Sequence, residues 1–286
     1  MNPVLLIAQF DRLTETPEAV PRLRGFLLDL AARGRLVAQD RKDEPAAELL
    51  KHIESTQLLV LSDRELRKLG GLEPIDEAEL PFPSPPGWKV TRLGWLAEKL
   101  GAGSTPLGGK SVYQDDGIPF LRSQNVYPEG LRLDDIARIP ATIHEKMSGT
   151  HVQALDILLN ITGASIGRCA LVPPTLGEAN VSQHVAIIRL FLPDIRDFIH
   201  LLLRSQAYQT LIDTVQVGVS RPGLSMQRLR QFPMFVPPMA EQRRIVEKVD
   251  ELMALCDELE ESLTTAQTQR SRLLEAVLHE ALETVG

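Results

Sequence analysis

The C-terminal part of the chain carries a long heptad pattern, which constrains the fold more than any other feature of the sequence. Across residues 241–283 apolar side chains recur at alternating steps of four and three, with no proline or glycine among them. The predicted seam consists of Ile245, Val249, Leu252, Cys256, Leu259, Leu263, Ala266, Leu273 and Val277, with Arg270 as its one charged residue. A helix of this period buries its seam against a partner helix, and at about 1.5 Å per residue the seam is roughly 50 Å long. We therefore expect a spacer helix that pairs with another helix and holds two bodies apart.

The N-terminal part predicts two shorter helices. One begins at Pro21 and ends before Gly34, the glycine expected just after a helix C-terminus. Its apolar face is predicted to comprise Leu23, Phe26, Leu27, Leu30 and Ala31. The second helix follows a turn-rich stretch at residues 39–43 and runs through Leu49, Leu50 and Ile53. Prolines at positions 74, 81, 83, 85 and 86 then exclude a helix or a central strand, so we interpret residues 73–87 as a linker.

Residues 88–238 predict a β-rich domain. Short apolar runs at residues 118–121, 157–161, 169–172 and 185–190 alternate with glycine, proline and asparagine turns, which is the pattern of strands. A helical stretch at residues 195–215 interrupts them. We therefore expect an α+β fold in which strands distant in sequence pair with one another.

The net charge of −7 hides an asymmetry along the chain. Residues 1–85 carry a charge of −4, residues 86–238 carry +3, and residues 239–286 carry −6. Lysine and arginine give proteins their non-specific affinity for DNA by neutralising phosphates. Only the middle segment is thus predicted to bind nucleic acid, and its positive charge is modest.

Cellular location and cysteine chemistry follow from two further observations. No apolar stretch approaches the roughly 20 residues of a membrane span, and the apolar run at residues 4–8 has no basic region before it. We therefore expect a cytoplasmic protein with no membrane association. Cys169 and Cys256 are too few and too isolated for a disulfide framework or a zinc site, so we interpret Cys256 as a buried seam residue.

Catalytic motifs are incomplete in this sequence. Residues 103–111 are similar to a phosphate loop, but the spacing is one residue too long and Pro106 stands where a backbone N–H should cradle phosphate. The Pro-Pro pairs lack the aromatic residue of an adenine methyltransferase loop, and Pro193-Asp194 is followed by no Glu-x-Lys within the domain. His184 has no cysteine or carboxylate spaced as a fellow metal ligand. We expect neither a catalytic site, nor a metal, nor a cofactor in this chain.

Polar side chains gather instead in glycine-flanked loops of the basic segment, at residues 122–125, 160–168, 180–184 and 220–223. Asparagine and glutamine can pair with adenine and arginine with guanine in the major groove, while serine and threonine contact phosphate. The same residue types also cap turns and satisfy buried backbone groups in any β-rich domain. Their concentration in the only basic part of the chain favours contact with DNA.

Motifs spread over nearly the whole chain are similar to those of a known protein family. In the N-terminal part, the matching stretches are residues 21–31, 34–37 and 39–46. The middle matches at Pro86-Gly87-Trp88 and at residues 93–94, 103–106, 118–122, 158–167 and 180–184. The end matches at residues 221–224 and 237–246. With these motifs in this order, the chain resembles the specificity (S) subunit of type I restriction-modification systems, in a half-length form with a single target recognition domain.

The resemblance implies a fold and a function. Residues 1–72 would form the N-terminal helical conserved region, 73–87 the linker, 88–238 the target recognition domain, and 239–286 the long C-terminal helix. The fold class implied is α+β, with a β-rich recognition domain and long conserved helices that form an antiparallel coiled-coil spacer. A recognition domain of this family reads one half-site of double-stranded DNA, and the helices dock methyltransferase (M) subunits. S-adenosylmethionine and ATP are expected on partner subunits, which include M and in some assemblies restriction (R) subunits.

A chain with one recognition domain reads half a target. We therefore expect a homodimer that reads an inverted repeat whose gap is set by helix length, or else pairing with a different half-subunit. The alternative function is a coiled-coil protein-interaction scaffold without DNA readout.

The predicted site residues fall into three sets. Candidate DNA-binding residues are Lys110, Arg122, Ser123, Gln124, Asn125, Thr162, Ser165, Arg168, Gln183, His184 and Arg221. Of these, the candidate phosphate contacts are Lys110, Arg122 and Arg168, and the candidate base readers are Gln124, Asn125, Thr162, Ser165, Gln183 and Arg221. Residues 113–116 and 127–132 lie outside the family-typical stretches and are the alternative base readers, because residues that select a base should differ among family members. The dimer and spacer positions are Ile245, Val249, Leu252, Cys256, Leu259, Leu263, Leu273 and Val277.

Overall fold

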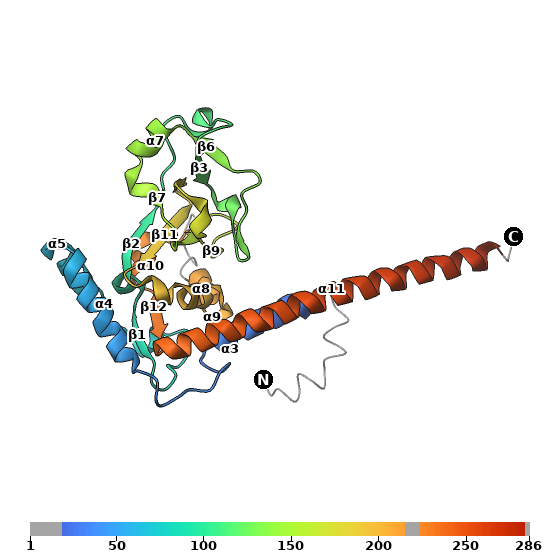
Figure 1. Cartoon of the computed structure of the whole chain (residues 1–286), viewed down its shortest axis with the longest axis horizontal. Helices are drawn as coiled ribbons and strands as arrows, with labels where there is room; N and C mark the ends of the chain where they lie inside the picture. The colour runs from blue at the N-terminus through green and yellow to red at the C-terminus, as the bar shows by residue number, and fades with distance from the viewer. Residues whose placement is uncertain (1–18, 215–222, 284–286) are drawn as a thin grey trace.

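A computed structural model describes residues 19–214 and 223–283 and shows a mixed body from which one long helix projects (Figure 1). Its α-helices are α3 (Ala19–Ala32), α4 (Ala46–Val60), α5 (Asp63–Gly70), α6 (Leu93–Leu96), α7 (Ala141–Lys146), α8 (Arg196–Arg204), α9 (Gln206–Thr214), α10 (Met226–Arg230) and α11 (Met239–Glu283). Its 3-10 turns are η1 (Glu77–Glu79), η2 (Gly109–Val112), η3 (Ser123–Asn125), η4 (Ser148–Thr150), η5 (Pro174–Leu176) and η6 (Pro193–Ile195). Among these described helices, none is both long enough and apolar enough to span a bilayer.

The strands form two four-stranded sheets and two small ladders. They are β1 (Lys89–Arg92), β2 (Ala97–Ala102), β3 (Ile118–Leu121), β4 (Val126–Tyr127), β5 (Gly130–Leu131), β6 (Ala137–Ile139), β7 (His151–Val152), β8 (Ile157–Asn160), β9 (Cys169–Leu171), β10 (Ala179–Val181), β11 (Val185–Leu190) and β12 (Pro233–Val236). One large sheet has the order β2-β11-β8-β9 and the other β6-β3-β10-β7, while β1 pairs with β12 and β4 with β5. The four predicted strand regions are confirmed to within one residue. The non-local pairing is confirmed as well, since β1 and β12 come from opposite ends of the domain.

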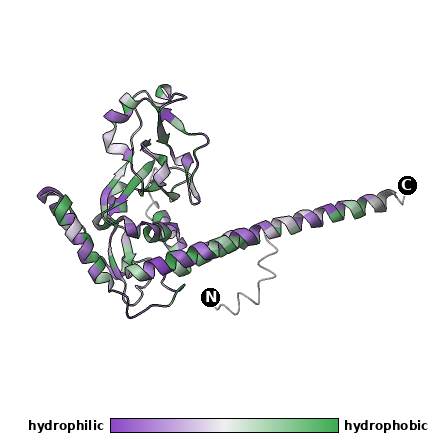
Figure 2. Cartoon of the chain, in the orientation of Figure 1, coloured by the Kyte–Doolittle hydropathy of each residue, from purple (hydrophilic) through white to green (hydrophobic). Residues whose placement is uncertain are grey.

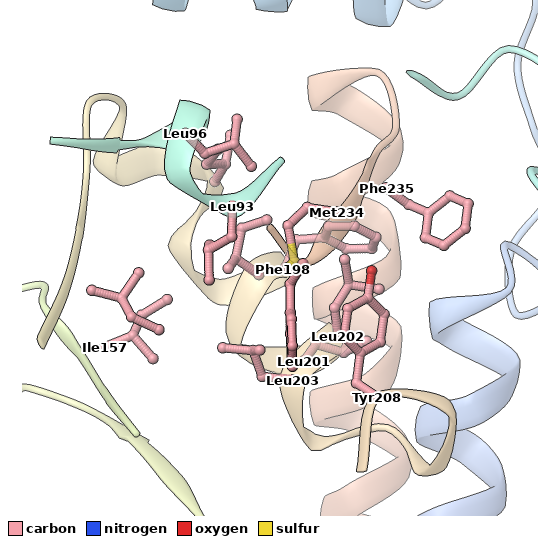
Figure 3. Packing of buried hydrophobic residues seen from close by; sticks show 14 of the residues in the cluster. Leu93, Leu96, Ile157, Phe198, Leu201, Leu202, Leu203, Tyr208, Met234 and Phe235 are labelled. Carbon is pink, nitrogen blue, oxygen red and sulfur yellow. The ribbon is translucent and has the colours of Figure 1, made fainter. Parts of the chain in front are cut away.

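The central sheet β2-β11-β8-β9 has a hydrophobic core on each face. Because side chains alternate along a strand, Ile188 of β11 points to the helices whereas its neighbour Ile187 points to the second sheet. The larger core joins that sheet to helices α3, α4, α8 and α11, and Figure 3 shows part of it, with Phe198 near the middle of the drawn side chains. The predicted helical stretch after residue 195 is confirmed as α8 and α9, which supply much of this core.

Helix α3 packs as the antiparallel neighbour of the first half of α11. Arg24, near the start of α3, forms ion pairs with Asp257 and Glu260 at 2.5 Å each. Asp43, which follows α3, pairs at 2.6 Å with Arg244 near the start of α11. The partner helix predicted for the first half of the seam is therefore present within this chain.

The predicted end of α3 is confirmed, but of its predicted apolar face only Ala31 is fully buried. Gly34 has a φ of 63° and its N–H donates to the carbonyl of Ala31, as a C-terminal glycine cap requires. The fully covered side chains are centred on Leu28, Ala31 and Ala32, whereas Leu23, Phe26, Leu27 and Leu30 are only half-buried. The reason is that α3 contacts α8 and α9 as well as α11, so its covered face is broader than one stripe and turned toward Leu28.

The predicted linker is fixed rather than loose. The buried guanidinium of Arg92 donates to the backbone carbonyls of Glu73 and Pro74 at 3.0 and 2.6 Å, and pairs with Glu79 at 2.6 Å. Phe82 stacks on Phe235 of β12 with ring centroids 4.2 Å apart. This segment therefore belongs to the same core as the strands that follow it.

The seam of α11 divides into a covered and an uncovered half. Ile245, Val249 and Cys256 are buried, and Leu252, Leu259 and Leu263 are half-buried. Leu273 and Val277 are 67% and 61% exposed on the part of the helix that projects from the body (Figure 1). Hydropathy colouring shows apolar and polar residues alternating along the whole of α11 (Figure 2). The apolar pattern thus continues well past the last residue that the body covers.

Candidate nucleic-acid interface

Strand ends bring four polar loops together at one edge of the two large sheets. β3 and β10 are parallel, with Leu121 opposite Val181, so both end at this edge. β8 and β2 also end here, because Asn160 and Ala102 pair with the first two residues of β11. The loops at residues 103–112, 122–125, 161–168 and 182–184 therefore lie next to one another, and we name them the polar edge. Most residues of the sequence clusters at 122–125, 160–168 and 180–184 lie in loops after β3, β8 and β10, as the sequence predicted.

Backbone hydrogen bonds hold the polar edge together. The N–H groups of Gly103 and Ser104 donate to the carbonyls of Val185 and Val181, at 2.9 and 3.1 Å. A side chain at Gly103 would place its Cβ 2.1 Å from the Val181 carbonyl oxygen, so only glycine allows this approach. Ser104 and Thr105, exposed in the same loop, are candidate contacts that the predicted residue set omitted. The motif of residues 103–106 could have indicated these two residues, but we interpreted it only as a possible phosphate loop and as a match to the family.

Asn160 links two of the loops from beneath. Its side chain is fully buried, and Nδ2 donates to the Ser123 carbonyl at 2.9 Å and to Ser165 Oγ at 3.1 Å. Ser165 is half-buried and its hydroxyl oxygen accepts this bond. Ser123 and Ser165, both predicted to contact DNA, therefore have a structural role in joining the loop after β3 to the loop after β8.

His184 is held by Thr162 at the surface of the polar edge. Thr162 Oγ1 lies 2.5 Å from His184 Nδ1, and the backbone N–H of Ile161 donates to the His184 carbonyl at 2.9 Å. The imidazole is exposed, as is the neighbouring Gln183. The bond at Nδ1 fixes the ring, which leaves Nε2 as a polar atom that can meet a base edge.

Arg221 lies outside the described residues. Gly223 is described, and it forms an antiparallel bridge with Thr162, while the N–H of Leu224 donates to the Ile161 carbonyl at 2.8 Å. The chain that follows Arg221 therefore joins the same edge as Thr162.

Asn125 is a correction to the predicted base readers. Its side chain is 3% exposed, its Oδ1 accepts from the Arg122 N–H, and its Nδ2 donates to the Arg132 carbonyl, both at 2.9 Å. An amide whose oxygen and nitrogen are both occupied by backbone groups has no free edge for adenine. Asn125 therefore shapes the loop, while its exposed neighbour Gln124, which contacts Asp135 at 3.4 Å, is the amide that DNA can reach.

The predicted phosphate contacts differ in their environments. Lys110 is exposed on η2. Arg122 is half-buried, lies over the Tyr113 ring at 5.8 Å and donates to the Asp135 carbonyl at 3.1 Å, so its guanidinium is less accessible than the charged groups of the other two. Arg168 is exposed and lies over the ring of Tyr127. Of the three, Lys110 and Arg168 present freely accessible cations.

The two segments predicted as alternative base readers also differ in the charged side chains that they expose. At residues 113–116 the backbone of Gln114 bridges to Arg138, and Asp115 and Asp116 are exposed carboxylates, which a phosphate backbone repels. Residues 127–132 form the β4–β5 hairpin, which places Tyr127 and Arg132 beside Arg168. The second segment thus places one cation, Arg132, beside Arg168, although it also exposes Glu129, whereas the charged side chains that the first segment exposes are both acids.

The strongly perturbed titratable groups lie in the core rather than at the polar edge. Burial lowers the pKa of His200 to about 4 and raises the pKa of Cys169 to about 12. Burial also raises the pKa of Tyr208, whose hydroxyl donates to the Pro233 carbonyl at 2.6 Å. Within residues 19–214 and 223–283 no group of three or more His, Cys, Asp and Glu side chains is arranged to hold a metal ion. The chemistry that the polar edge offers is therefore hydrogen bonding and charge.

Comparison with protein families and curated proteins gives consistent results. The sequence profile described as the type I restriction modification DNA specificity domain matches residues 85–267. The chain is 28% identical over 284 residues to the specificity subunit of the type I restriction enzyme EcoEI of Escherichia coli. It is also 28% identical over 281 residues to that of EcoAI from the same organism. These alignments cover 96% of this chain but 47% and 46% of the relatives, so the chain spans about half the length of the curated relatives it matches.

Two solved structures share the fold. One, titled for complex assembly and conformational transition of the type I R-M system, has a TM-score of 0.56 at 19% identity, covering 97% of this chain and 57% of that chain. The other, the HsdS subunit from Thermoanaerobacter tengcongensis, has a TM-score of 0.50 at 20% identity, covering 96% and 56%. The predicted fold class, an α+β body with a long spacer helix, is confirmed.

Proposed function

Since the chain belongs to the family of type I restriction modification DNA specificity domains, we propose that it recognises a DNA sequence on behalf of a type I restriction-modification complex. The observation that carries the proposal is the polar edge, where four loops from distant parts of the sequence meet. These loops belong to the only segment of the chain with a positive net charge, residues 86–238. Accessible amide, imidazole and cationic groups at one surface are what direct readout of a DNA half-site needs.

Catalysis is assigned to other subunits. We place methylation, with its S-adenosylmethionine, on M subunits, and cleavage, with its ATP, on R subunits where these are present. The antiparallel pair of α3 and α11 is the proposed docking surface for the M subunits, as the family resemblance implies. We also propose that the protein is located in the cytoplasm.

The uncovered half of α11 is proposed to pair with the same helix of a second copy. Beyond residue 263 the seam continues through Ala266, Leu273 and Val277, and the body of this chain leaves all three exposed. Seam spacing of three and four residues fits a helical partner rather than a flat surface. A two-fold pair of chains would present two recognition domains and read an inverted repeat, whose gap the helices set. Pairing with a different half-subunit would join two unlike half-sites instead.

Salt dependence of duplex binding tests the proposed function. Each phosphate contact contributes about −0.9 to the slope of log affinity against log salt, so a DNA-reading subunit should show a steep negative slope. The measurement is fluorescence anisotropy of a labelled duplex titrated with the full chain, alone and with the M subunit, at several salt concentrations. A coiled-coil scaffold without DNA readout would bind no duplex in either form, and that result would overturn the proposal.

A further inference from the structure

Two arginines share one aromatic ring beside the polar edge. The guanidinium carbon of Arg132 lies 3.5 Å from the Tyr127 ring centroid, and that of Arg168 lies 5.0 Å from it. The two guanidinium groups are therefore within about 8.5 Å of each other, the sum of these distances. Both arginines are exposed and the tyrosine is half-buried. We name these three residues the Tyr127 cluster.

The backbone beneath the Tyr127 cluster is fixed by hydrogen bonds. The N–H of Arg132 donates to the Asn125 carbonyl at 2.9 Å, and the carbonyl of Arg168 accepts from the Asn160 N–H at 2.8 Å. The hairpin that carries Tyr127 packs on β9, which begins directly after Arg168. Because Asn160 also bonds to the loop after β3, the cluster is continuous with the polar edge. Two cations are thus presented from positions that the sheet sets.

Among the described residues, no carboxylate neutralises the two arginines of the Tyr127 cluster. Other arginines of the domain are committed to carboxylates: Arg189 to Asp156 at 2.8 Å and Arg92 to Glu79 at 2.6 Å. Neither Arg132 nor Arg168 forms an ion pair with any residue that the structure describes. The π-face of a tyrosine attracts a guanidinium, but two cations brought to one ring also repel each other. An anion bound between them would remove that repulsion.

We propose that the Tyr127 cluster is a clamp for the phosphate backbone of DNA, placed beside the base-reading edge. The inference rests on the proposed function and extends it, since it assigns Tyr127 and Arg132 a role together with Arg168. A guanidinium binds phosphate oxygens through paired N–H donors, and successive phosphates of one strand follow each other about every 3.4 Å along the helix axis. The clamp contacts phosphates only, so it adds affinity on every sequence and fixes the register of the polar edge on the duplex.

Glutamine substitutions of the two arginines test the clamp. Arg132→Gln and Arg168→Gln should each weaken binding equally on target and unrelated duplexes, and each should reduce the magnitude of the salt slope by about one. In measured terms, the ratio of affinities at 50 and 200 mM salt should shrink about 3.5-fold for each arginine removed. The charge-matched control is Arg64→Gln on α5, an exposed arginine far from the polar edge, which should leave the ratio unchanged.

Substitutions of the ring separate positioning from direct contact. Tyr127→Phe keeps the π-face and should behave as the unaltered chain, whereas Tyr127→Leu removes the face that holds both guanidiniums and should weaken binding on all duplexes. Circular dichroism and thermal unfolding of each variant establish that it is folded.

The outcomes distinguish the clamp from the proposed function. A steep slope in the unaltered chain that both arginine variants retain in full overturns the clamp and leaves the proposed function standing. No duplex binding by the unaltered chain, alone or with the M subunit, overturns both. Variants that keep the full slope but no longer assemble with the M subunit would assign the cluster to an acidic protein surface, which also overturns the clamp.

Discussion

Trp88 and Glu241 join the start of the recognition domain to the start of the long helix. The Trp88 indole N–H donates to Glu241 Oε1 at 3.0 Å, and both side chains are buried. Gln39 Nε2 donates to the same carboxylate oxygen at 3.3 Å, so the segment after α3 reaches it too. Glu241 lies in the first turn of α11, where the helix dipole favours a negative charge. Three parts of the chain thus meet at one carboxylate, which fixes the direction in which α11 leaves the body.

Removal of that carboxylate should destabilise the fold. Glu241→Ala leaves a buried indole N–H without an acceptor, which costs about 1–3 kcal/mol of unfolding free energy. Chemical unfolding followed by tryptophan fluorescence measures this directly, because Trp88 is one of two tryptophans. Glu247→Ala, at an exposed position of the same helix, is the control and should change the free energy by less than about 0.5 kcal/mol. Equal unfolding midpoints for the two variants would contradict this role of Glu241.

Stability should fall in mild acid because of His200. Burial, with the nearby charge of Arg204, lowers the pKa of His200 to about 4, against about 6.5 in an unfolded chain. Between these two pKa values His200 is protonated in the unfolded chain but neutral in the folded chain. The unfolding free energy therefore decreases as pH falls through this window. At the acid end the loss attributable to His200 reaches about 3 kcal/mol.

The test of His200 compares the pH dependence of the unfolding free energy in two proteins, the unaltered chain and a His200 variant. Carboxylates also titrate below pH 5, so the informative quantity is the difference in unfolding free energy between the chain and His200→Gln across pH 4–7. That difference should shrink as pH falls, because glutamine does not titrate. A difference that stays constant with pH would show that His200 is not the group responsible.

Base readout should depend on His184 and Gln183 rather than on Asn125. Replacement of His184 by alanine should cost about 1–3 kcal/mol at one base position and little on duplexes changed at that position. Thr162→Val, which removes the hydroxyl that holds the imidazole, should lower the same preference by a smaller amount. Asn125→Ala should instead reduce thermal stability and weaken all duplexes alike. Affinities measured on a panel of single-base variants separate these patterns, and a uniform loss for His184→Ala would contradict its assignment.

Arg221 is predicted to pair with a guanine. If it does, Arg221→Ala should likewise cost about 1–3 kcal/mol at a single base position in the same panel. An equal loss on every duplex would instead indicate a phosphate contact.

The distal seam should control the association of chains. Val277→Glu places a charge where we propose that a second α11 packs, and it should convert a dimer into a monomer in light scattering. Ser271→Glu adds the same charge outside the seam and should leave the dimer intact. Because the body of the chain covers neither position, both variants should keep the native circular dichroism spectrum, and any stability that Val277→Glu loses should be the part that depends on protein concentration. A monomer for the unaltered chain at micromolar concentration would contradict the homodimer.

Local sequence patterns predicted the helices and strands of this fold better than they predicted which elements pack against each other. The heptad spacing placed α11 within two residues of its observed start, and apolar runs placed four strands, because both signals depend on neighbours in sequence. The identity of the helix that packs on the first half of α11 depends on contacts such as Arg24 with Asp257, which lie far apart in the chain. Spacing along α11 indicates that a partner exists but carries no information about which helix it is.

The candidate site shows the same limit at the level of single residues. Gln124 and Asn125 are adjacent amides with the same chemistry, yet only Asn125 is buried, because the backbone of Arg122 and Arg132 closes around it. The sequence could identify residues 127–132 as an atypical segment. It could not show that Arg168, in another loop, would share the ring of Tyr127, since that contact follows from the packing of the β4–β5 hairpin on β9.

Selection of bound duplexes from a randomised pool tests sequence recognition most directly. The full chain, assembled with its M subunit, is used to retain duplexes, which are then sequenced over several rounds. The proposed function predicts enrichment of a short set of fixed bases, repeated in inverted orientation at a constant gap if two copies pair. A retained pool whose base composition at every position equals that of the input would contradict the claim that this chain reads DNA sequence.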